Sequence, residues 1–309
     1  MKPSRIRIGT RGSPLALWQA NEVKRCLQKA HLGLAEAAAV EIVVIKTSGD
    51  RLQQGLLSEV GGKGLFTKEI DDALSEGRID IAVHSMKDVP TCLPGGLIID
   101  CVLPRADPRD ALISQGVSSI AKLPAGTIVG TASLRRKAML LYNRPDLTVV
   151  PLRGNVDTRL EKVISGRVDA TFLALAGLQR LGRNDVPATP VSVDEMLPAV
   201  CQGIVGIERR EDDNNTAALL TPLNDPDASV QAEGERELLA GLDGSCRTPI
   251  AAYAAVEGNE LTFRAAIVRP DGSELLETRR SGPAEDSASM GRDAAEELRG
   301  RAGPGFFNE

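Results

Sequence analysis

The chain has 309 residues, too many for one ordinary hydrophobic core and enough for two or three compact domains. Apolar residues make up 42% of it and aromatic residues only 3%, which is typical of a soluble globular protein whose cores are built from Val, Ile, Leu and Ala. The formal net charge of −5, from 37 basic and 42 acidic residues, argues against wholesale binding of nucleic acid or an anionic membrane, so any basic function must be local.

The first residues carry no signal-peptide pattern, because Met1 to Arg7 leads directly into a charged, alternating strand pattern. The most apolar run, residues 34–45, is interrupted by Glu36 and Glu41 and is too short to span a bilayer. We therefore expect a cytoplasmic protein.

The first elements are predicted to form a strand–helix–strand unit. Residues 5–10 alternate between polar and apolar side chains, as in a strand. Ser13 and Pro14 then supply a helix N-cap and a first helical residue, and an apolar stripe at helical spacing runs from residue 16 to residue 30. A β-branched run at 40–45 follows. This order predicts a parallel sheet with helices on its faces.

The same pattern recurs along the chain and restarts after a proline-rich junction at residues 104–108. A further strand is predicted within residues 197–208, which would return the chain to the first group of strands. Two connections between two α/β lobes predict a hinged pair with a cleft between them. The other strands predicted in this part of the chain are 79–83, 97–103, 127–131, 147–151 and 168–174.

From Asp225 the pattern changes to that of a small α+β domain. Alternating segments separated by the turns EGN and PDG predict an antiparallel sheet, with one helix before it and one after it. The predicted elements are a helix at 228–242, strands at 250–256, 261–268 and 274–280, and a helix at 284–299. The predicted domain boundaries are 1–103 with 204–221 for the first domain, 109–197 for the second and 226–309 for the third.

The chain has five cysteines, at positions 26, 92, 101, 201 and 246, and two histidines, His31 and His84. In a reducing compartment we expect no disulfide framework, and no CxxC pair is present to hold zinc or an iron–sulfur cluster. Cys246 lies in the sequence GSCRTPI, on a predicted loop between a helix and a strand. Loops run over the surface, where a purely packed thiol is unusual, so two roles stay open for Cys246: a packed apolar side chain or a nucleophile.

Polar groups collect at the predicted ends of several strands, where open α/β sheets bind ligands. They are hydroxyls, guanidinium groups and the backbone N–H groups of helix starts, which bind carboxylate or phosphate. The arginines are either solvated surface charges or the lining of an anion-binding cleft, and five of them at strand ends of an acidic chain favour the cleft. No GxxxxGK[ST] sequence supports a nucleotide site. The junctions are 10–13, 84–88, 131–136 and 153–155, with Arg159 one turn further on.

Asp88 is a carboxylate within this basic set and directly follows Lys87. Kept ionised by its neighbours, it would stabilise a developing cation or transfer a proton; the alternative is an aspartate that only shapes a turn. The glycine-rich segment 47–64 is predicted to be a mobile loop. It is either a lid from which Lys63 reaches the cleft or an ordinary connection.

The longer motifs are TRGSPLALWQA, VGGKGLFTKEI, DIAVHSMKDVP, GTASLRR, LRGNVDTRL, LAGLQRLG and QGIVGIE, followed by the cysteine loop. Together they resemble the porphobilinogen deaminase (hydroxymethylbilane synthase) family from about residue 5 to the last helix. HSMKDVP in combination with GTASLRR and LRGN is highly specific. In that family the loop cysteine carries a dipyrromethane cofactor through a thioether bond, so the resemblance implies that Cys246 is the attachment site.

The resemblance implies a transferase of tetrapyrrole (haem and chlorophyll) biosynthesis. Such an enzyme condenses four porphobilinogen molecules head to tail, with release of ammonia, onto the dipyrromethane, and then releases hydroxymethylbilane by hydrolysis. A thiolate is suited to attack the electrophilic methylene that porphobilinogen forms on losing ammonia. Each pyrrole carries an acetate and a propionate, so the growing chain is polyanionic and requires an arginine-lined cleft. No metal and no nucleotide is implied.

The matching positions also imply a role for each candidate residue. Asp88 matches the catalytic carboxylate, which contacts pyrrole N–H groups and stabilises the cation, and Lys63 belongs to the lid. The residues implied to bind cofactor carboxylates are Lys87, Thr131, Ser133, Arg135 and Arg136, and those implied to bind the substrate or the growing chain are Arg11, Ser13, Arg153, Arg159 and Arg180. Three positions depart from the family pattern: Gly12 and Glu59, which bear on how the mobile loop meets the chain, and Cys201, a spare thiol near the hinge.

The expected fold class is α/β, with two hinged α/β lobes of periplasmic-binding-protein-like topology and a small α+β C-terminal domain that has a three-stranded antiparallel sheet. Two other functions fit parts of the sequence. A two-lobe anion receptor without catalysis would share the lobes, but the Cys246 loop in an added domain argues against it. A nucleic-acid-binding protein is disfavoured by the net charge and the scarce aromatic residues. We therefore expect a monomeric enzyme whose partner is the small molecule porphobilinogen, with no nucleic acid and no membrane.

Overall fold

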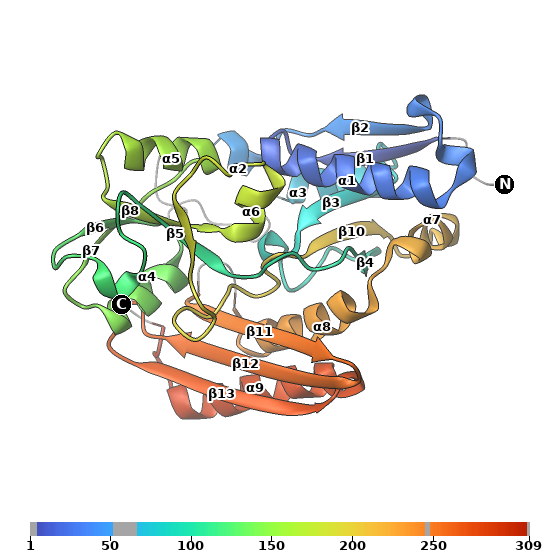
Figure 1. Ribbon diagram of the computed structural model, residues 1–309. Coiled ribbons are helices and arrows are strands. Elements are labelled where there is room, and N and C mark those ends of the chain that lie inside the picture. The colour runs from blue at the N-terminus through green and yellow to red at the C-terminus, as the bar shows by residue number, and fades with distance from the viewer. Residues whose placement is uncertain (1–4, 52–66, 245–247, 308–309) are drawn as a thin grey trace. The chain divides into compact units, whose positions relative to one another are not determined.

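The computed structural model describes residues 5–51, 67–244 and 248–307, and the chain divides into two compact units (Figure 1). The first unit consists of residues 1–105 and 204–229, and the second of residues 106–203 and 230–309. Within the described ranges, no helix is long and apolar enough to cross a membrane.

The first unit is built around a five-stranded mixed sheet with the strand order β2-β1-β3-β10-β4. β1 (Ile6–Thr10) pairs in parallel with both β2 (Val40–Val44) and β3 (Ile81–Ser85). β10 (Val205–Arg210) lies antiparallel between β3 and β4 (Leu97–Val102). The helices of this unit are α1 (Pro14–Ala30), α2 (Ser48–Arg51), α3 (Lys68–Ser75) and α7 (Asn214–Leu220).

Helices cover both faces of this sheet, because successive side chains of a strand point to opposite faces. On one face Ile8 of β1 belongs to the same buried cluster as Val23 of α1. On the other face Ala82 of β3 belongs to a cluster with Ile70 of α3. α1 begins as the sequence predicts, since the Ser13 side chain accepts a hydrogen bond from a backbone N–H of the first turn. The predicted strand–helix–strand unit is confirmed.

The second unit contains another five-stranded sheet, with the strand order β7-β6-β8-β5-β9. β6 (Ile128–Gly130) pairs in parallel with β7 (Thr148–Val150) and β8 (Ala170–Ala174). β5 (Asp110–Ser114) is antiparallel to both β8 and β9 (Ala188–Pro190). Both sheets therefore consist of three parallel strands, one antiparallel strand and a fifth strand beside it. The helices here are α4 (Leu134–Asn143), α5 (Val156–Ile164) and α6 (Leu175–Arg180).

The C-terminal part is a three-stranded antiparallel sheet, drawn in orange in Figure 1, with α8 (Pro226–Gly241) before it and α9 (Ser287–Ala302) after it. Its strands are β11 (Ile250–Glu257), β12 (Glu260–Val268) and β13 (Leu275–Pro283). Ala266 of β12 shares a buried cluster with Leu112 and Met139 of the five-stranded part. The predicted second and third domains thus share a core within one unit, and the division into three domains stays a prediction.

Short 3₁₀ helices complete the structure, at Leu32–Leu34, Ala37–Ala39, Met86–Asp88, Ile120–Lys122, Thr221–Leu223 and Ala284–Asp286. The predicted fold class is confirmed in its two mixed α/β sheets and its three-stranded antiparallel sheet. The strand predicted within 197–208 begins only at Val205. The residues before it turn instead of extending, because Cys201 and Gly203 have positive φ angles of 57° and 94°.

Glycines let α8 and α9 approach each other closely, and this contact yields a test of the C-terminal packing. A Cβ added at Gly291 of α9 would lie 2.2 Å from the backbone oxygen of Gly234 in α8, whereas one added at Gly300 meets nothing within 4 Å. Gly291→Ala should lower the free energy of unfolding by ~2–3 kcal/mol, because a backbone oxygen cannot move aside. Gly300→Ala in the same helix should raise it by up to ~1 kcal/mol. Urea unfolding of both variants measures the difference, and equal midpoints would contradict the described packing.

Candidate active site

The first group of candidate residues lies at the carboxyl ends of β1 and β3. Arg11 directly follows β1, Ser13 caps α1, and Lys87 and Asp88 belong to the 3₁₀ turn that follows β3. Because β1 and β3 are parallel neighbours, the loops that follow them lie at one edge of the first sheet. Asp88 is exposed, whereas Arg11, Ser13 and Lys87 are half-buried. The structure thus brings four candidate residues to one edge.

The end of β3 is fixed from two sides. Gln19, which is 2% exposed in α1, donates from Nε2 to Ser85 Oγ at 2.8 Å. The backbone N–H of Met86 donates to the carbonyl oxygen of Ile204 at 3.0 Å. These two hydrogen bonds fix the end of β3, where the turn that carries Asp88 begins.

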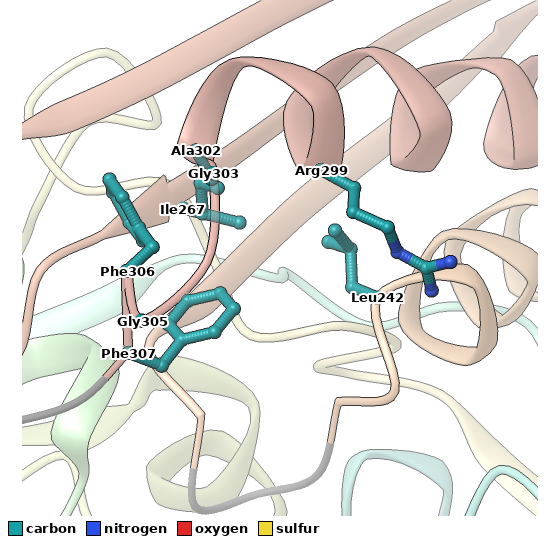
Figure 2. A pocket seen from close by; sticks show the side chains of 8 residues that line it. All are labelled: Leu242, Ile267, Arg299, Ala302, Gly303, Gly305, Phe306 and Phe307. Atoms are coloured by element: carbon teal, nitrogen blue, oxygen red, sulfur yellow. The ribbon is translucent and has the colours of Figure 1, made fainter.

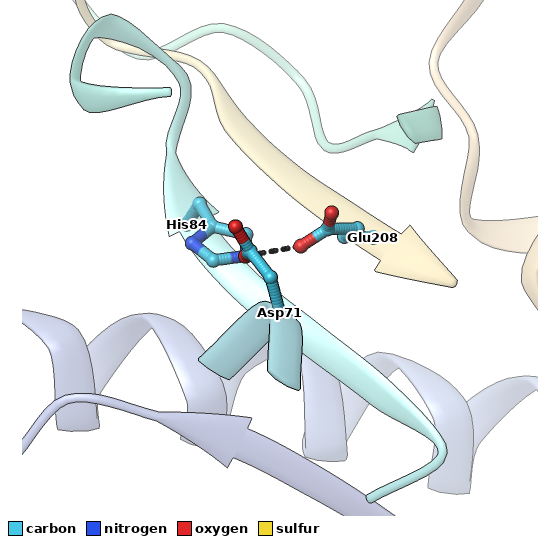
Figure 3. Close-up of side chains that lie close together, drawn as sticks. All are labelled: Asp71, His84 and Glu208. Carbon is cyan, nitrogen blue, oxygen red and sulfur yellow. Dashed lines mark hydrogen bonds and ion pairs between the residues drawn. The ribbon is translucent and has the colours of Figure 1, made fainter. Parts of the chain in front are cut away.

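A buried cluster consists of Asp71 from α3, His84 from β3 and Glu208 from β10 (Figure 3). It lies on the face of the first sheet that α3 covers. Nε2 of His84 lies 2.9 Å from a carboxylate oxygen of Glu208, and one nitrogen or oxygen atom of each side chain lies within 4.8 Å of the others. Burial, and after it the nearby Glu208 carboxylate, together raise the pKa of Asp71 to about 6 against the opposing effect of His84. No sequence pattern predicts this cluster, because Glu208 is far from Asp71 and His84 in the chain. Its side chains are of metal-binding types, and the expectation that no metal is needed stays a prediction.

The second group of candidate residues lies at the carboxyl ends of β6, β7 and β8. Thr131 and Ser133 follow β6, Arg153 follows β7, and Arg180 ends α6, the helix that follows β8. The Ser133 side chain accepts a hydrogen bond from the backbone N–H of Arg136 at 3.4 Å and so caps α4, as predicted. These three strands are parallel, so the group shares one edge of the second sheet.

Backbone carbonyls hold two arginines of this edge. Nε of Arg159 donates to the carbonyl oxygen of Gly154 at 2.9 Å. Nη2 of Arg180 donates to the carbonyl oxygen of Gly203 at 2.7 Å. Both side chains, like that of Arg153, are half-buried.

Arg135 and Arg136 are buried and share one carboxylate, that of Asp110. They are 4% and 5% exposed, and Asp110 is 0% exposed. Each donates from Nη2 to an Asp110 oxygen at 2.7 Å, and Nε of Arg136 lies 3.2 Å from Asp110 Oδ1. Their Nη1 atoms donate to the carbonyl oxygens of Leu197 at 2.7 Å and Phe172 at 2.8 Å.

The electrostatics of this cluster follow from its burial. Burial alone would raise the pKa of Asp110, but the charges of Arg135 and Arg136 and the hydrogen bonds it accepts hold that pKa well below its usual range. Burial lowers the pKa of Arg135, Asp110 opposes that shift, and the like charge of Arg136 adds to it. Two guanidinium groups and one carboxylate leave an excess of one positive charge. A cluster of this kind, beside the Thr131 and Ser133 hydroxyls, fits an anionic ligand.

Asp110 and its neighbour Gln202 are the residues of this site that the sequence analysis missed. Nε2 of Gln202 donates to Asp110 Oδ1 at 2.9 Å and to the carbonyl oxygen of Pro108 at 2.7 Å. The signal that was present is a charged residue at the start of DALIS, an otherwise apolar run. The sequence alone does not show that this aspartate faces Arg135 and Arg136.

A pocket of about 220 Å³ lies elsewhere in the second unit, at the C-terminal end of α9 (Figure 2). Its lining includes the apolar side chains of Leu242, Ile267, Phe306 and Phe307 and also Arg299, whose Nη2 lies 3.3 Å from Oδ2 of Asp243. None of the predicted site residues that the structure describes lines it. Cys246 and Lys63 lie outside the described residues, as do Glu59 and most of the predicted lid, so their roles stay predictions.

Comparisons with known proteins match one and the same family over nearly the whole chain. The sequence profile described as "Porphobilinogen deaminase, dipyromethane cofactor binding domain" matches residues 6–218, and the one described as "Porphobilinogen deaminase, C-terminal domain" matches residues 230–300. The porphobilinogen deaminase of Paracoccus denitrificans is 57% identical over 303 residues, which cover 98% of this chain and 96% of that protein. The chloroplastic porphobilinogen deaminase of Oryza sativa is 57% identical over 99% of this chain and 87% of that protein.

Solved structures also resemble the chain, at lower similarity. The methionine binding protein MetQ aligns with a TM-score of 0.44 and 14% identity over 75% of this chain and 95% of that one. The sequence profiles and the relatives, which extend over nearly the whole length, decide the classification. The chain belongs to the porphobilinogen deaminase family.

Proposed function

We propose that this chain condenses four porphobilinogen molecules head to tail, with release of ammonia, and then releases hydroxymethylbilane by hydrolysis. The observation that carries this proposal is the 57% identity to a porphobilinogen deaminase over 98% of the chain. The buried, positively charged cluster at the start of α4 is consistent with it, because the substrate and every intermediate of chain growth carry several carboxylates.

The residues at the start of α4 fit the dipyrromethane cofactor of the family. When bound, dipyrromethane supplies the pyrrole carbon to which the first porphobilinogen is joined. Thr131 and Ser133 offer hydroxyls, and Arg135 and Arg136 offer guanidinium groups with only one carboxylate between them. We propose that these four residues bind the carboxylates of the cofactor, and that Lys87 binds one as well.

Asp88 is proposed to act on the substrate as it loses ammonia. Its carboxylate is exposed, follows Lys87 and lies at the same sheet edge as Arg11 and Ser13. A carboxylate at this point would hydrogen-bond the pyrrole N–H and stabilise the cation that porphobilinogen forms. The residues proposed to bind carboxylates of the substrate or growing chain are Arg11, Ser13, Arg153, Arg159 and Arg180.

Cys246 is proposed to hold the cofactor through its sulfur. A thiolate is a soft nucleophile and forms a thioether that survives later turnovers, which an ester would not. A cytoplasmic location and a monomeric state are proposed from the sequence alone; relatives from rice and pea are named chloroplastic.

Attachment of the cofactor to Cys246 can be tested by removing its thiol. Cys246→Ser should give a folded protein without bound dipyrromethane, because a hydroxyl is a far weaker nucleophile than a thiolate. Cys92→Ser, which changes an exposed thiol, should keep the cofactor. Intact-mass spectrometry reads both. A Cys246→Ser protein that still carries the dipyrromethane mass would end the assignment of this cysteine.

The role of the Asp88 carboxylate can be tested by removing its charge. Asp88→Asn keeps the shape of the side chain but removes its charge, so it should retain the cofactor and lose roughly 100-fold or more in turnover rate. Asp72→Asn, a matched change at an exposed position of α3, should leave the rate within twofold of wild type, a margin of about 0.4 kcal/mol. Steady-state product formation measures both, and an Asp88→Asn rate within a few-fold of wild type would make Asp88 a turn residue only.

The candidate arginines are expected to divide into two groups by role. Gln substitutions of Arg135 and Arg136 should abolish cofactor assembly, whereas those of Arg11, Arg153 and Arg159 should permit assembly and stall elongation. Arg183→Gln is the control, because Arg183 pairs with Asp185 at 2.9 Å and has no proposed ligand. Intact-mass spectra taken with limiting porphobilinogen distinguish unloaded protein from covalent species that differ by one pyrrole. The same spectrum for both groups would refute the division.

A further inference from the structure

Asp110 lies where it can act on both arginines at the start of α4. It is the first residue of β5 and pairs opposite Ala174, the last residue of β8. Because β5 is antiparallel to β8, its first residue lies at the edge where β6 and β8 end. Its side chain is 0% exposed, so its two oxygens are committed to partners inside the protein.

The arginine pair needs such a partner. Arg135 and Arg136 lie in the first turn of α4, where the positive end of the helix dipole disfavours cations. Both guanidinium groups are nearly fully buried, so each repels the other with little screening by water. Asp110 is the carboxylate that forms ion pairs with them among the described residues, and it bonds one with each oxygen.

Asp110 is held in turn by a residue that is far away in the sequence. Gln202 is 1% exposed and donates to both Asp110 and the carbonyl oxygen of Pro108. The preceding residue, Cys201, donates its backbone N–H to the carboxylate of Glu235 in α8, and Glu235 also accepts the backbone N–H of Ala254 in β11 at 2.8 Å. The buried carboxylates of Glu235 and Asp110 thus accept hydrogen bonds from Cys201 and Gln202, which are adjacent residues of one turn.

We propose that Asp110 is a positioning residue for cofactor assembly. It orients the guanidinium groups of Arg135 and Arg136 and neutralises one of their charges, so that a single excess positive charge faces the carboxylates of the incoming pyrroles. Gln202 keeps Asp110 in place, and the Cys201–Gln202 turn links the arginine pair to α8 and β11, which flank Cys246 in the sequence. This inference rests on the proposed function, because the carboxylates are those of the dipyrromethane.

A kinetic measurement distinguishes positioning from a general contribution to stability. Full-length protein made in cells that cannot synthesise porphobilinogen is incubated with porphobilinogen, and the gain of dipyrromethane mass is followed over time. Misplaced arginines weaken the capture of carboxylates, so Asp110→Asn should raise the half-saturating porphobilinogen concentration of loading at least tenfold. The limiting loading rate should stay within about threefold, which corresponds to ~0.7 kcal/mol, because Cys246 and Asp88 are untouched. A loss of folded protein alone would lower the amplitude of loading and leave half-saturation unchanged.

Two further variants complete the design. Asp107→Asn is the matched control, since Asp107 pairs with Arg109 at 2.6 Å and contacts neither Arg135 nor Arg136 in any described bond. It should load like wild type. Gln202→Met removes the bonds to Asp110 and Pro108 without changing charge, and should raise half-saturation several-fold. It decides the matter if Asp110→Asn does not fold.

Each result has one meaning. Raised half-saturation in Asp110→Asn and Gln202→Met, with Asp107→Asn unchanged, supports the positioning role. If Asp110→Asn folds and its half-saturating concentration lies within twofold of wild type, the positioning role is overturned. If Asp110→Asn does not fold, the same result in Gln202→Met overturns it. Wild-type protein that gains no dipyrromethane mass would instead refute the proposed function itself, so the two failures are distinguishable.

Discussion

Asp110 is a carboxylate without solvent exposure, and it lies between two buried guanidinium groups. The packing of the second unit around it depends on these ion pairs. Moving these charges out of water costs several kcal/mol for each ion, and removing one partner of a buried pair typically costs ~3–5 kcal/mol. The cost is partly offset where the remaining donors are also satisfied. The carbonyl oxygens of Leu197 and Phe172 accept from the two Nη1 atoms, whereas Nε of Arg135 has no hydrogen-bond partner among the described residues. Segments distant in sequence therefore meet at this point.

The two five-stranded sheets use one topology for different chemistry. Each presents the carboxyl ends of three parallel strands at a single edge, where loops and helix starts supply polar groups. In the first unit that edge carries an exposed carboxylate, Asp88, beside Lys87 and Arg11. In the second unit most of the charged groups are arginines, two of them deeply buried with Asp110 between them. The proposed reaction needs both kinds of site, one to stabilise a transient cation and one to bind permanent anions.

The local features of this structure were predictable from the sequence, and the long-range ones were not. Ser13 and Ser133 cap helices as their positions indicate, and the strands that carry the candidate loops occur where the apolar runs predict them. Asp110 and Arg135 bond to each other although they are 25 residues apart in the sequence. Asp110 and Gln202 do so although they are 92 residues apart. No periodic pattern encodes such contacts.

The same limit explains two other differences. His84 and Glu208 are 124 residues apart, so their pairing depends on β3 and β10 becoming neighbours. The prediction of a strand within 197–208 is wrong for the residues before Val205. Cys201 there adopts a left-handed conformation that non-glycine residues rarely take. Its N–H is bound by Glu235, a tertiary contact that propensity does not contain.

The position of β10 has a consequence for the order in which the protein is made. This strand separates β3 from β4 in the first sheet, yet it follows the whole of residues 106–203 in the chain. At ribosomal rates of about 5–20 residues per second, roughly 5–20 s pass after the synthesis of β4 before β10, its neighbour among the described strands, is made. During that interval β3 and β4 present unpaired edges, which nascent chains expose to aggregation or to chaperones. The strands β5 to β9 need no such partner, so the second sheet can close on the ribosome before the first.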